Sequence, residues 1–375
     1  MNNRELLKHY VVHGGDKAIC SPQIGAGAGF DTMLAGKRWI SETTLEDLAA
    51  AWKRFDVVPL YNLGLPDLTQ LVPDVETSAE RHFEADKNRY VTDCRFCTPL
   101  GTLTSLLVEH EIDGVSQTKY LIVDEDELEI LEIYLDRLLE VEGFSPITRG
   151  VREQREAVGE DVAMDIQWAM QPYELLCFPN TVDTAVFAMT CPEIFTRLME
   201  KILRLNEKLI PAVAAGGSDF VFLGGPGSEM ISPDYYERFL VPYSKILSEM
   251  AHQNGLLIYS HICSPIEPML TMGYYNQMGI DLFETLSQAP VGNVASIGDA
   301  FGKLDERICT RGNIGLDRLL NATPEEIREE SLAILETAKR MGRKHILAAS
   351  DYMFYQTKVE NVQAMVDACA EFNAR

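Results

Sequence analysis

A histidine and a cysteine two residues apart follow a short apolar run in the second half of the chain. The segment 256–263, LLIYSHIC, is interpreted as a buried strand that ends in a loop presenting His261 and Cys263. Residues two apart on an extended chain lie on the same side, so the imidazole and the thiolate would point together. Zinc takes nitrogen and sulfur ligands of this kind. A structural interpretation stays open, in which His261 caps the strand through hydrogen bonds and Cys263 is a small buried residue.

The composition is that of an acidic globular protein. The 375 residues, 46% of them hydrophobic, are enough to bury the core of one large domain or of two average ones. The 33 basic and 57 acidic residues give a net charge of −24, which argues against nucleic acid and anionic membranes as partners. No apolar run approaches the roughly 18 residues of a membrane span, and the start, MNNRELLKHY, lacks the apolar core of a signal peptide. We therefore expect a cytoplasmic protein whose eight cysteines are free thiols or metal ligands.

Two motifs nearer the N-terminus do not match the zinc-binding and phosphate-binding patterns that they suggest. Cys94 and Cys97 form a CxxC pair, but no second pair follows at zinc-ribbon spacing, and their segment alternates like a hairpin strand. The Gly-rich stretch 25–30, GAGAGF, lacks the GxGxxG spacing and the Lys-Ser/Thr ending of a P-loop. We expect a mobile loop there, which lets a ligand approach the backbone.

Eight apolar runs are spaced as strands, and helical patterns separate most of them. The expected strands are 18–21, 55–60, 162–166, 219–224, 256–261, 281–284, 307–311 and 345–350. Eight parallel strands with right-handed crossovers close into a (β/α)8 barrel. We therefore predict an α/β fold, a TIM barrel formed as a single domain by residues 1–375. Two β-rich runs and a helical pattern interrupt the alternation, which predicts an N-terminal hairpin and helix insertion at about 89–141.

In such a barrel, the residues just past each strand share one mouth, where active sites lie. These residues include His261, Cys263, Glu284, Asn313 and Asp351. Glu284 and Asp351 follow apolar strand residues, so each carboxylate would be partly desolvated and suited to metal ligation or proton transfer. The alternative for either carboxylate is a helix N-cap or an arginine partner.

The order of several motifs resembles the uroporphyrinogen decarboxylase superfamily. Over the C-terminal half these are ISPDYYERFLVPYSKIL, YSHICS, RGNI followed by TPEEI, and ILAASDYMFYQTKVENVQAMV; the N-terminal half matches through TPLGT and TKYLIV. The resemblance implies a (β/α)8 barrel with its site at the carboxyl face, and one of two activities. One branch removes acetate carboxyls from a tetrapyrrole without a cofactor. The other comprises zinc-dependent methyltransferases that move a methyl group between a corrinoid protein and a thiol or a small methylated substrate.

Two positions discriminate between these branches. The decarboxylases carry substrate-binding arginines immediately after their first strand, whereas CSPQIGAGAGF has neither Arg nor Lys, and the next basic residue is Lys37. The methyltransferases carry a His-x-Cys after the fifth strand, matched by His261 and Cys263, and a further Cys after the eighth. This chain has Asp351 at the last position. Aspartate is an acceptable zinc ligand, but it is harder than a thiolate and donates less charge to the metal.

The resemblance therefore implies a methyltransferase that binds Zn2+ through His261, Cys263 and Asp351. We expect His261, Glu284 and Asp351 to be its catalytic residues. Tyr259, Asn313 and Tyr352 are expected to contact the cofactor. The methyl carrier would be the cobalt of a separate corrinoid protein, the other partner a small methyl donor or acceptor, and a homodimer is compatible with the resemblance.

Two other functions stay open. One is a metal-free decarboxylase in which Glu284 or Asp351 donates the proton. The other is a non-catalytic barrel that binds a tetrapyrrole or a corrinoid.

Overall fold

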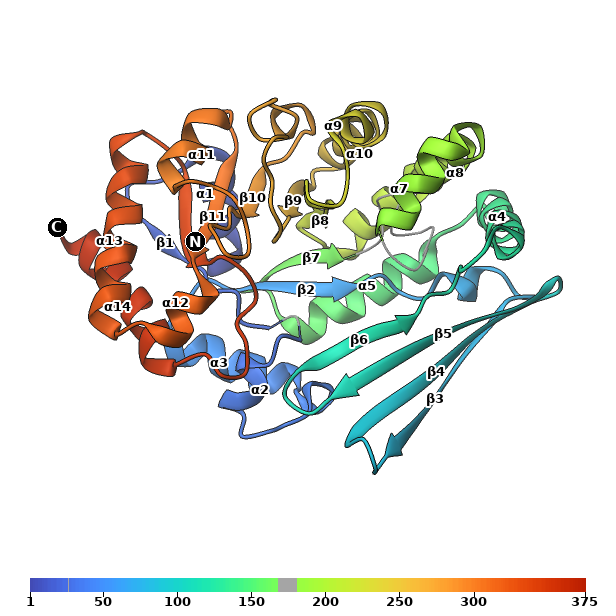
Figure 1. Ribbon diagram of the computed structural model, residues 1–375, viewed down its shortest axis with the longest axis horizontal. Helices are drawn as coiled ribbons and strands as arrows, with labels where there is room; N and C mark the ends of the chain where they lie inside the picture. Colours follow the sequence, from blue (N-terminus) through green and yellow to red (C-terminus); the bar gives the residue numbers. More distant parts are fainter. Residues whose placement is uncertain (26, 168–180) are drawn as a thin grey trace.

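The computed structural model describes residues 1–25, 27–167 and 181–375, and a parallel sheet lies at its centre (Figure 1). Its strands are β1 (Ile19–Cys20), β2 (Leu60–Gly64), β7 (Ala163–Gln167), β8 (Phe220–Phe222), β9 (Leu257–His261), β10 (Leu282–Thr285), β11 (Cys309–Ile314) and β12 (His345–Ala349). They are hydrogen-bonded in the order β1-β12-β11-β10-β9-β8-β7-β2, and every pair is parallel. The Gly-rich loop expected at 25–30 is described except for residue 26.

The two ends of the sheet meet beside β1. The Val58 N–H donates to the Cys20 carbonyl at 3.3 Å, and the Ser21 hydroxyl donates to the Val58 carbonyl at 2.6 Å. The sheet is therefore curled, and the prediction of a (β/α)8 barrel is confirmed.

Helices alternate with these strands and cover the outside of the sheet (Figure 1). They are α1 (Asn3–His13), α2 (Phe30–Leu34), α3 (Leu45–Phe55), α4 (Glu125–Glu140), α5 (Ser145–Val158), α7 (Thr181–Thr190), α8 (Pro192–Gly216), α9 (Pro233–Tyr235), α10 (Val241–Gln253), α11 (Ile297–Lys303), α12 (Leu316–Asn321), α13 (Pro324–Arg340) and α14 (Val359–Ala374). The N-terminus of α13 has the reciprocal hydrogen bonds between Thr323 and Glu326 that its sequence predicts.

Two expected elements differ from the observed structure. The second strand begins at Leu60, so the expectation of a strand over 55–60 is wrong for most of its length. Phe55 instead ends α3, because it continues a buried stripe with Leu48, Ala51 and Trp52 at helical spacing. Between β9 and β10, the sequence from Ile266 to Met272 also predicts a helix, but the chain there forms a series of turns, since Pro265 and Pro268 each remove a backbone donor.

The N-terminal insertion is a four-stranded antiparallel sheet in the order β3-β4-β5-β6. Its strands are β3 (Glu76–Glu84), β4 (Arg89–Thr98), β5 (Gly101–His110) and β6 (Gly114–Lys119), and α4 follows them. The two β-rich runs noted in the sequence overlap β4 and β6, while β3 and β5 were not expected. Cys94 and Cys97 lie on β4 as free thiols.

The amino-terminal end of the barrel interior is filled by apolar side chains. Leu60, Ala163, Phe220, Leu282, Cys309 and Ile346 pack there with Leu7, Tyr10 and Val11 of α1. Because side chains alternate along a strand, residues two positions further on also face the interior. These include Asn62, Asp165, Glu284 and Arg311, which form a polar layer above the apolar one. Chemistry in this barrel is therefore confined to its carboxyl-terminal end.

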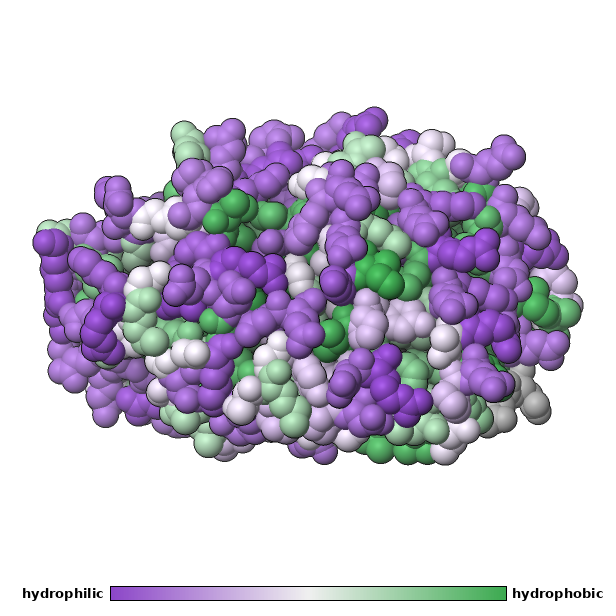
Figure 2. Space-filling view, turned by 90° about the horizontal axis from the view of Figure 1, so that it is seen from above, coloured by the Kyte–Doolittle hydropathy of each residue, from purple (hydrophilic) through white to green (hydrophobic). Residues whose placement is uncertain are grey.

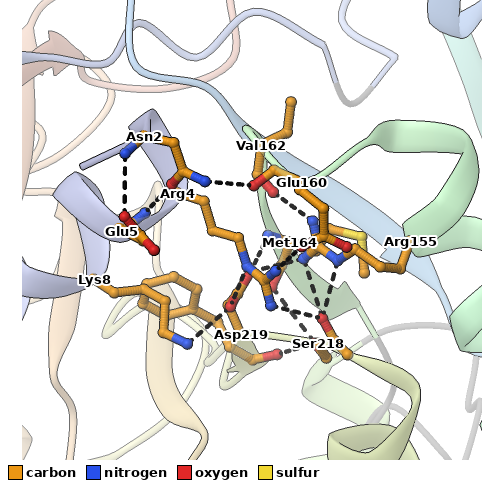
Figure 3. A network of polar contacts seen from close by, with 12 residues as sticks. Asn2, Arg4, Glu5, Lys8, Arg155, Glu160, Val162, Met164, Ser218 and Asp219 are labelled. Carbon is orange, nitrogen blue, oxygen red and sulfur yellow. Dashed lines mark hydrogen bonds and ion pairs between the residues drawn. The ribbon is translucent and has the colours of Figure 1, made fainter.

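A buried ion network holds the amino-terminal end together (Figure 3). The fully buried carboxylate of Asp219 accepts hydrogen bonds from Arg155 at 2.7 Å, from Arg4 at 2.9 Å and from Lys8 at 2.9 Å. It also accepts the backbone N–H of Met164 on β7 at 3.1 Å. The network therefore joins α1 and α5 to the start of β8.

The described surface is mixed in character. Figure 2 shows hydrophilic residues over most of the face seen from above, with hydrophobic residues in small groups between them. No helix in the part of the chain that the structure describes has the length and apolar character that crossing a membrane requires.

The Asp219→Ala variant is expected to lose about 3–5 kcal/mol of unfolding free energy, because Arg155 would stay buried without its counter-charge. Urea unfolding followed by circular dichroism measures this loss. Glu336→Ala is the control, since it breaks an exposed pair with Arg375 and should cost less than about 1 kcal/mol. Equal losses in the two variants would contradict the structural role of the buried network.

Candidate metal centre

Three side chains that can bind a metal meet at the mouth of the barrel. One ligand atom from each of His261, Cys263 and Asp351 lies within 4.8 Å of the others. His261 is the last residue of β9, and Asp351 lies two residues past the end of β12. Their closest approach is 3.3 Å, from His261 Nε2 to Asp351 Oδ1. Because β9 and β12 are not neighbours in the sheet, the closed barrel is what brings these ligands together.

Glu284 lies behind His261 and orients its ring. Its Oε1 is 2.5 Å from His261 Nδ1, and the two residues are paired in the register of β9 and β10. An imidazole whose one nitrogen is held by a carboxylate presents the other nitrogen in a defined direction, as metal-binding histidines do. His261 therefore directs Nε2 toward Asp351 and Cys263. The structure places Glu284 as a partner of the histidine, outside the three-residue cluster.

The Glu284 carboxylate is fully buried and is held by two further side chains. Arg311 donates from Nη1 to Glu284 Oε2 at 2.8 Å, and the Tyr259 hydroxyl donates to Oε1. Arg311 also donates from Nε to the Ser21 carbonyl at 2.9 Å. The arginine partner was one of the two alternatives for Glu284, but Arg311 itself was not singled out in the sequence. The available signal was an arginine at the end of the expected strand, RICTR, where residues that face the barrel mouth lie.

Tyr259 contacts the Glu284 carboxylate of this pair, and Tyr352 contacts the His261 imidazole. Burial and the charge of Glu284 raise the pKa of Tyr259 well above its ordinary value, so its phenol remains a donor. The Tyr352 ring stacks on His261 with centroids 5.2 Å apart and planes inclined by 16°. The two tyrosine hydroxyls are 3.5 Å apart. The two tyrosines that were predicted to contact the cofactor therefore lie next to Glu284 and His261, and Tyr259 is fully buried.

Asn313 has a different environment. Its side chain is buried and donates from Nδ2 to the Leu286 carbonyl at 3.1 Å, which ties β11 to the loop after β10. Among the described residues, none donates to its Oδ1. The structure therefore gives Asn313 a loop contact and does not join it to the three-residue cluster.

The cluster attracts positive charge. Burial by itself lowers the pKa of His261, but hydrogen bonds to Asp351, Cys263 and Glu284 outweigh it, and the pKa is raised well above the ordinary value. A divalent cation and a proton would compete for the same nitrogen.

The donor set suits zinc. One nitrogen, one sulfur and one oxygen ligand leave a fourth position open, which is the arrangement of catalytic zinc sites. All three side chains are partly exposed, so a ligand could reach them from the mouth of the barrel. Asp351 is itself held by the backbone, because the Tyr352 N–H donates to its Oδ1 at 2.7 Å.

Comparison with known proteins identifies the family. Residues 71–372 match the family described as uroporphyrinogen decarboxylase (URO-D). The chain belongs to this family, and the resemblance seen in its motifs is confirmed.

Among curated proteins, a uroporphyrinogen decarboxylase of Coxiella burnetii (strain RSA 493 / Nine Mile phase I) is 24% identical over 224 residues, which cover 56% of this chain and 58% of that protein. The same enzyme of Brucella abortus (strain 2308) is 24% identical over 247 residues, which cover 61% of this chain and 67% of that protein. The chain thus spans less than two thirds of the length of its C. burnetii relative.

Among solved structures, a methyltransferase from Methanosarcina mazei has a TM-score of 0.64 at 18% identity, and the match covers 99% of each chain. It shows that the two proteins share a fold.

We expect Glu284→Gln to weaken zinc binding by about 10- to 100-fold, because an uncharged amide orients His261 less strongly. Competition with a chromophoric chelator measures the affinity, and thermal unfolding confirms that the variant is folded. The control is Glu132→Gln. It removes a carboxylate on α4 that is paired with Arg197 and Lys201 and does not belong to the three-residue cluster. Unchanged affinity in folded Glu284→Gln protein would show that Glu284 does not support the metal site.

Proposed function

We propose that the protein is a zinc-assisted methyltransferase that moves a methyl group between a small substrate and the cobalt of a separate corrinoid protein. The observation that carries this proposal is the meeting of His261, Cys263 and Asp351, with His261 Nδ1 held by Glu284. Family membership and the fold shared with the M. mazei methyltransferase support it.

His261, Cys263 and Asp351 would hold the zinc. Bound there, the metal would supply a Lewis acid that favours a thiolate or polarises an oxygen attached to the methyl group. The heteroatom of the substrate keeps the electron pair when its bond to the methyl carbon breaks. The heteroatom therefore needs positive charge nearby. His261, Cys263 and Asp351 would bind the cation that supplies this charge at the mouth of the barrel.

The remaining residues keep this geometry. Arg311 and Tyr259 hold Glu284, Glu284 holds His261, and the backbone of Tyr352 holds Asp351. The Tyr352 ring covers one face of the imidazole and excludes water from it.

Asp351 influences which methyl compound is used. It stands where the resemblance to the methyltransferases implies a cysteine, and a carboxylate donates less charge to zinc than a thiolate does. A metal held by Asp351 in place of a cysteine would be a stronger Lewis acid. It would favour a methyl group bound to oxygen, whose leaving atom needs more stabilisation than sulfur.

Decarboxylation is the second candidate, because the curated relatives are uroporphyrinogen decarboxylases. A substrate with many carboxylates requires cationic donors that are available to it. The buried Arg311 does not meet this need, since Glu284 and the Ser21 and Pro22 carbonyls already engage it. Methyl transfer is therefore the function that the site supports better.

The test compares the wild type with His261→Ala, Cys263→Ala and Asp351→Ala, each purified without oxygen. We expect about one zinc per wild-type chain by plasma mass spectrometry, and loss of that zinc in the three variants. Transfer from a panel of methyl ethers, methyl thioethers and methylamines to a corrinoid protein should fall by more than about 100-fold in these variants, since losing a ligand costs more than losing its supporting partner.

Cys94→Ala is the matched control, because it removes a free thiol from the insertion and should change neither zinc content nor transfer. Full zinc content in His261→Ala and Cys263→Ala would contradict the proposal. Release of carbon dioxide from a carboxylated substrate by metal-free protein would instead establish the decarboxylase.

A further inference from the structure

The polar layer of the barrel interior contains a partly exposed amide on β2, Asn62. Leu60 belongs to the apolar layer, so Asn62, two residues further along β2, faces the same interior. Asn62 remains partly exposed, whereas Leu60 is buried. In the sheet, β7 and β8 separate β2 from β9, which carries His261. Asn62 and His261 therefore belong to different parts of the wall that surrounds one interior.

Asp165 holds this amide in one orientation. Asn62 Nδ2 donates to Asp165 Oδ2 at 3.1 Å, and the two residues are directly opposite in the register of β2 and β7. Asp165 is fully buried, and among the described residues its Oδ1 has no hydrogen-bond partner. Burial and the charge of Glu284 raise its pKa well above the ordinary value. The contact of Nδ2 with Asp165 Oδ2 sets which end of the Asn62 amide faces Asp165.

The orientation determines what Asn62 can recognise. Because Nδ2 is engaged by Asp165, the amide presents its carbonyl oxygen, which only accepts hydrogen bonds. None of the described residues donates to this oxygen. Its complement is a hydroxyl or an N–H group.

Aromatic side chains lie between the amide and the metal ligands. Phe222, two residues past the buried Phe220 on β8, is partly exposed in the interior, and its ring lies 5.7 Å from that of Tyr259. Tyr352 covers His261. A ligand that extends from the metal centre to Asn62 would therefore pass along a flat apolar wall.

We propose that Asn62 is a specificity-determining residue that accepts a hydrogen bond from a hydroxyl or N–H group at the end of the substrate remote from its methyl group. Asp165 is the positioning residue for Asn62, and Phe222 packs against the body of the substrate. The inference rests on the proposed function and adds the substrate class: a small, flat, apolar methyl compound with a hydrogen-bond donor opposite the methyl group.

Two probes that differ in the donor alone test this proposal. 4-Methoxyphenol carries the hydroxyl opposite its methoxy group, and 4-fluoroanisole replaces that hydroxyl with a fluorine of similar size that does not donate. Isothermal titration calorimetry on the zinc-loaded full chain should show that the wild type binds 4-methoxyphenol about three- to tenfold more tightly.

Variants of Asn62, Asp165 and Phe222 test which of these residues causes the preference for 4-methoxyphenol. Asn62→Ala should abolish the preference, and Asp165→Ala should reduce it, while Asp165→Asn retains it because an amide oxygen still accepts from Asn62. Phe222→Ala should weaken both probes equally. Thermal unfolding identifies any variant that fails to fold, and the ratio of the two affinities is insensitive to a general loss of stability.

A wild type that binds neither probe at millimolar concentration, or a preference that persists in Asn62→Ala, would overturn the inference. Binding requires no corrinoid protein and no turnover, so the two proposals fail separately. An Asn62-dependent preference without methyl transfer would leave the recognition site standing and remove the methyltransferase. Methyl transfer together with an unchanged preference in Asn62→Ala would support the methyltransferase and remove the recognition site.

Discussion

A buried carboxylate, Glu284, is the group on which the rest of the site depends. Removing a carboxylate from water costs several kcal/mol unless a counter-charge and hydrogen bonds compensate, and Arg311 and Tyr259 provide both. The register of three neighbouring strands places these groups, since Glu284 is paired with His261 on one side and with Arg311 on the other. The direction of His261 Nε2, and with it the position of a metal, follows from this arrangement.

The two ends of the barrel have separate tasks. At the amino-terminal end, α1 and the ions around Asp219 close the interior over apolar side chains. The polar layer above them orients Glu284 and Asn62, and the carboxyl ends of the strands carry the ligands. With a metal centre on the β9 wall and an oriented amide on β2, the interior favours a substrate that lies across the barrel.

The sequence predicts the barrel and the convergence of His261, Cys263 and Asp351, because both depend on periodicity and on which end of a strand a residue follows. It does not predict contacts that depend on the register between distant strands, such as Asn62 with Asp165 or Arg311 with Glu284. It misplaces the second strand, since Phe55, the first residue of the expected strand, also fits the buried stripe of α3. It also predicts two strands in the insertion where four exist, because the mostly exposed β3 has no apolar alternation.

X-ray absorption at the zinc edge tests the metal centre most directly, since it reports which atoms surround the metal. We expect one sulfur at about 2.3 Å, with the other ligands nitrogen or oxygen at about 2.0–2.2 Å. In Asp351→Cys, a second sulfur should appear at the same distance. A wild type that takes up no zinc, or zinc without a sulfur neighbour, would contradict the assignment of His261, Cys263 and Asp351 as its ligands.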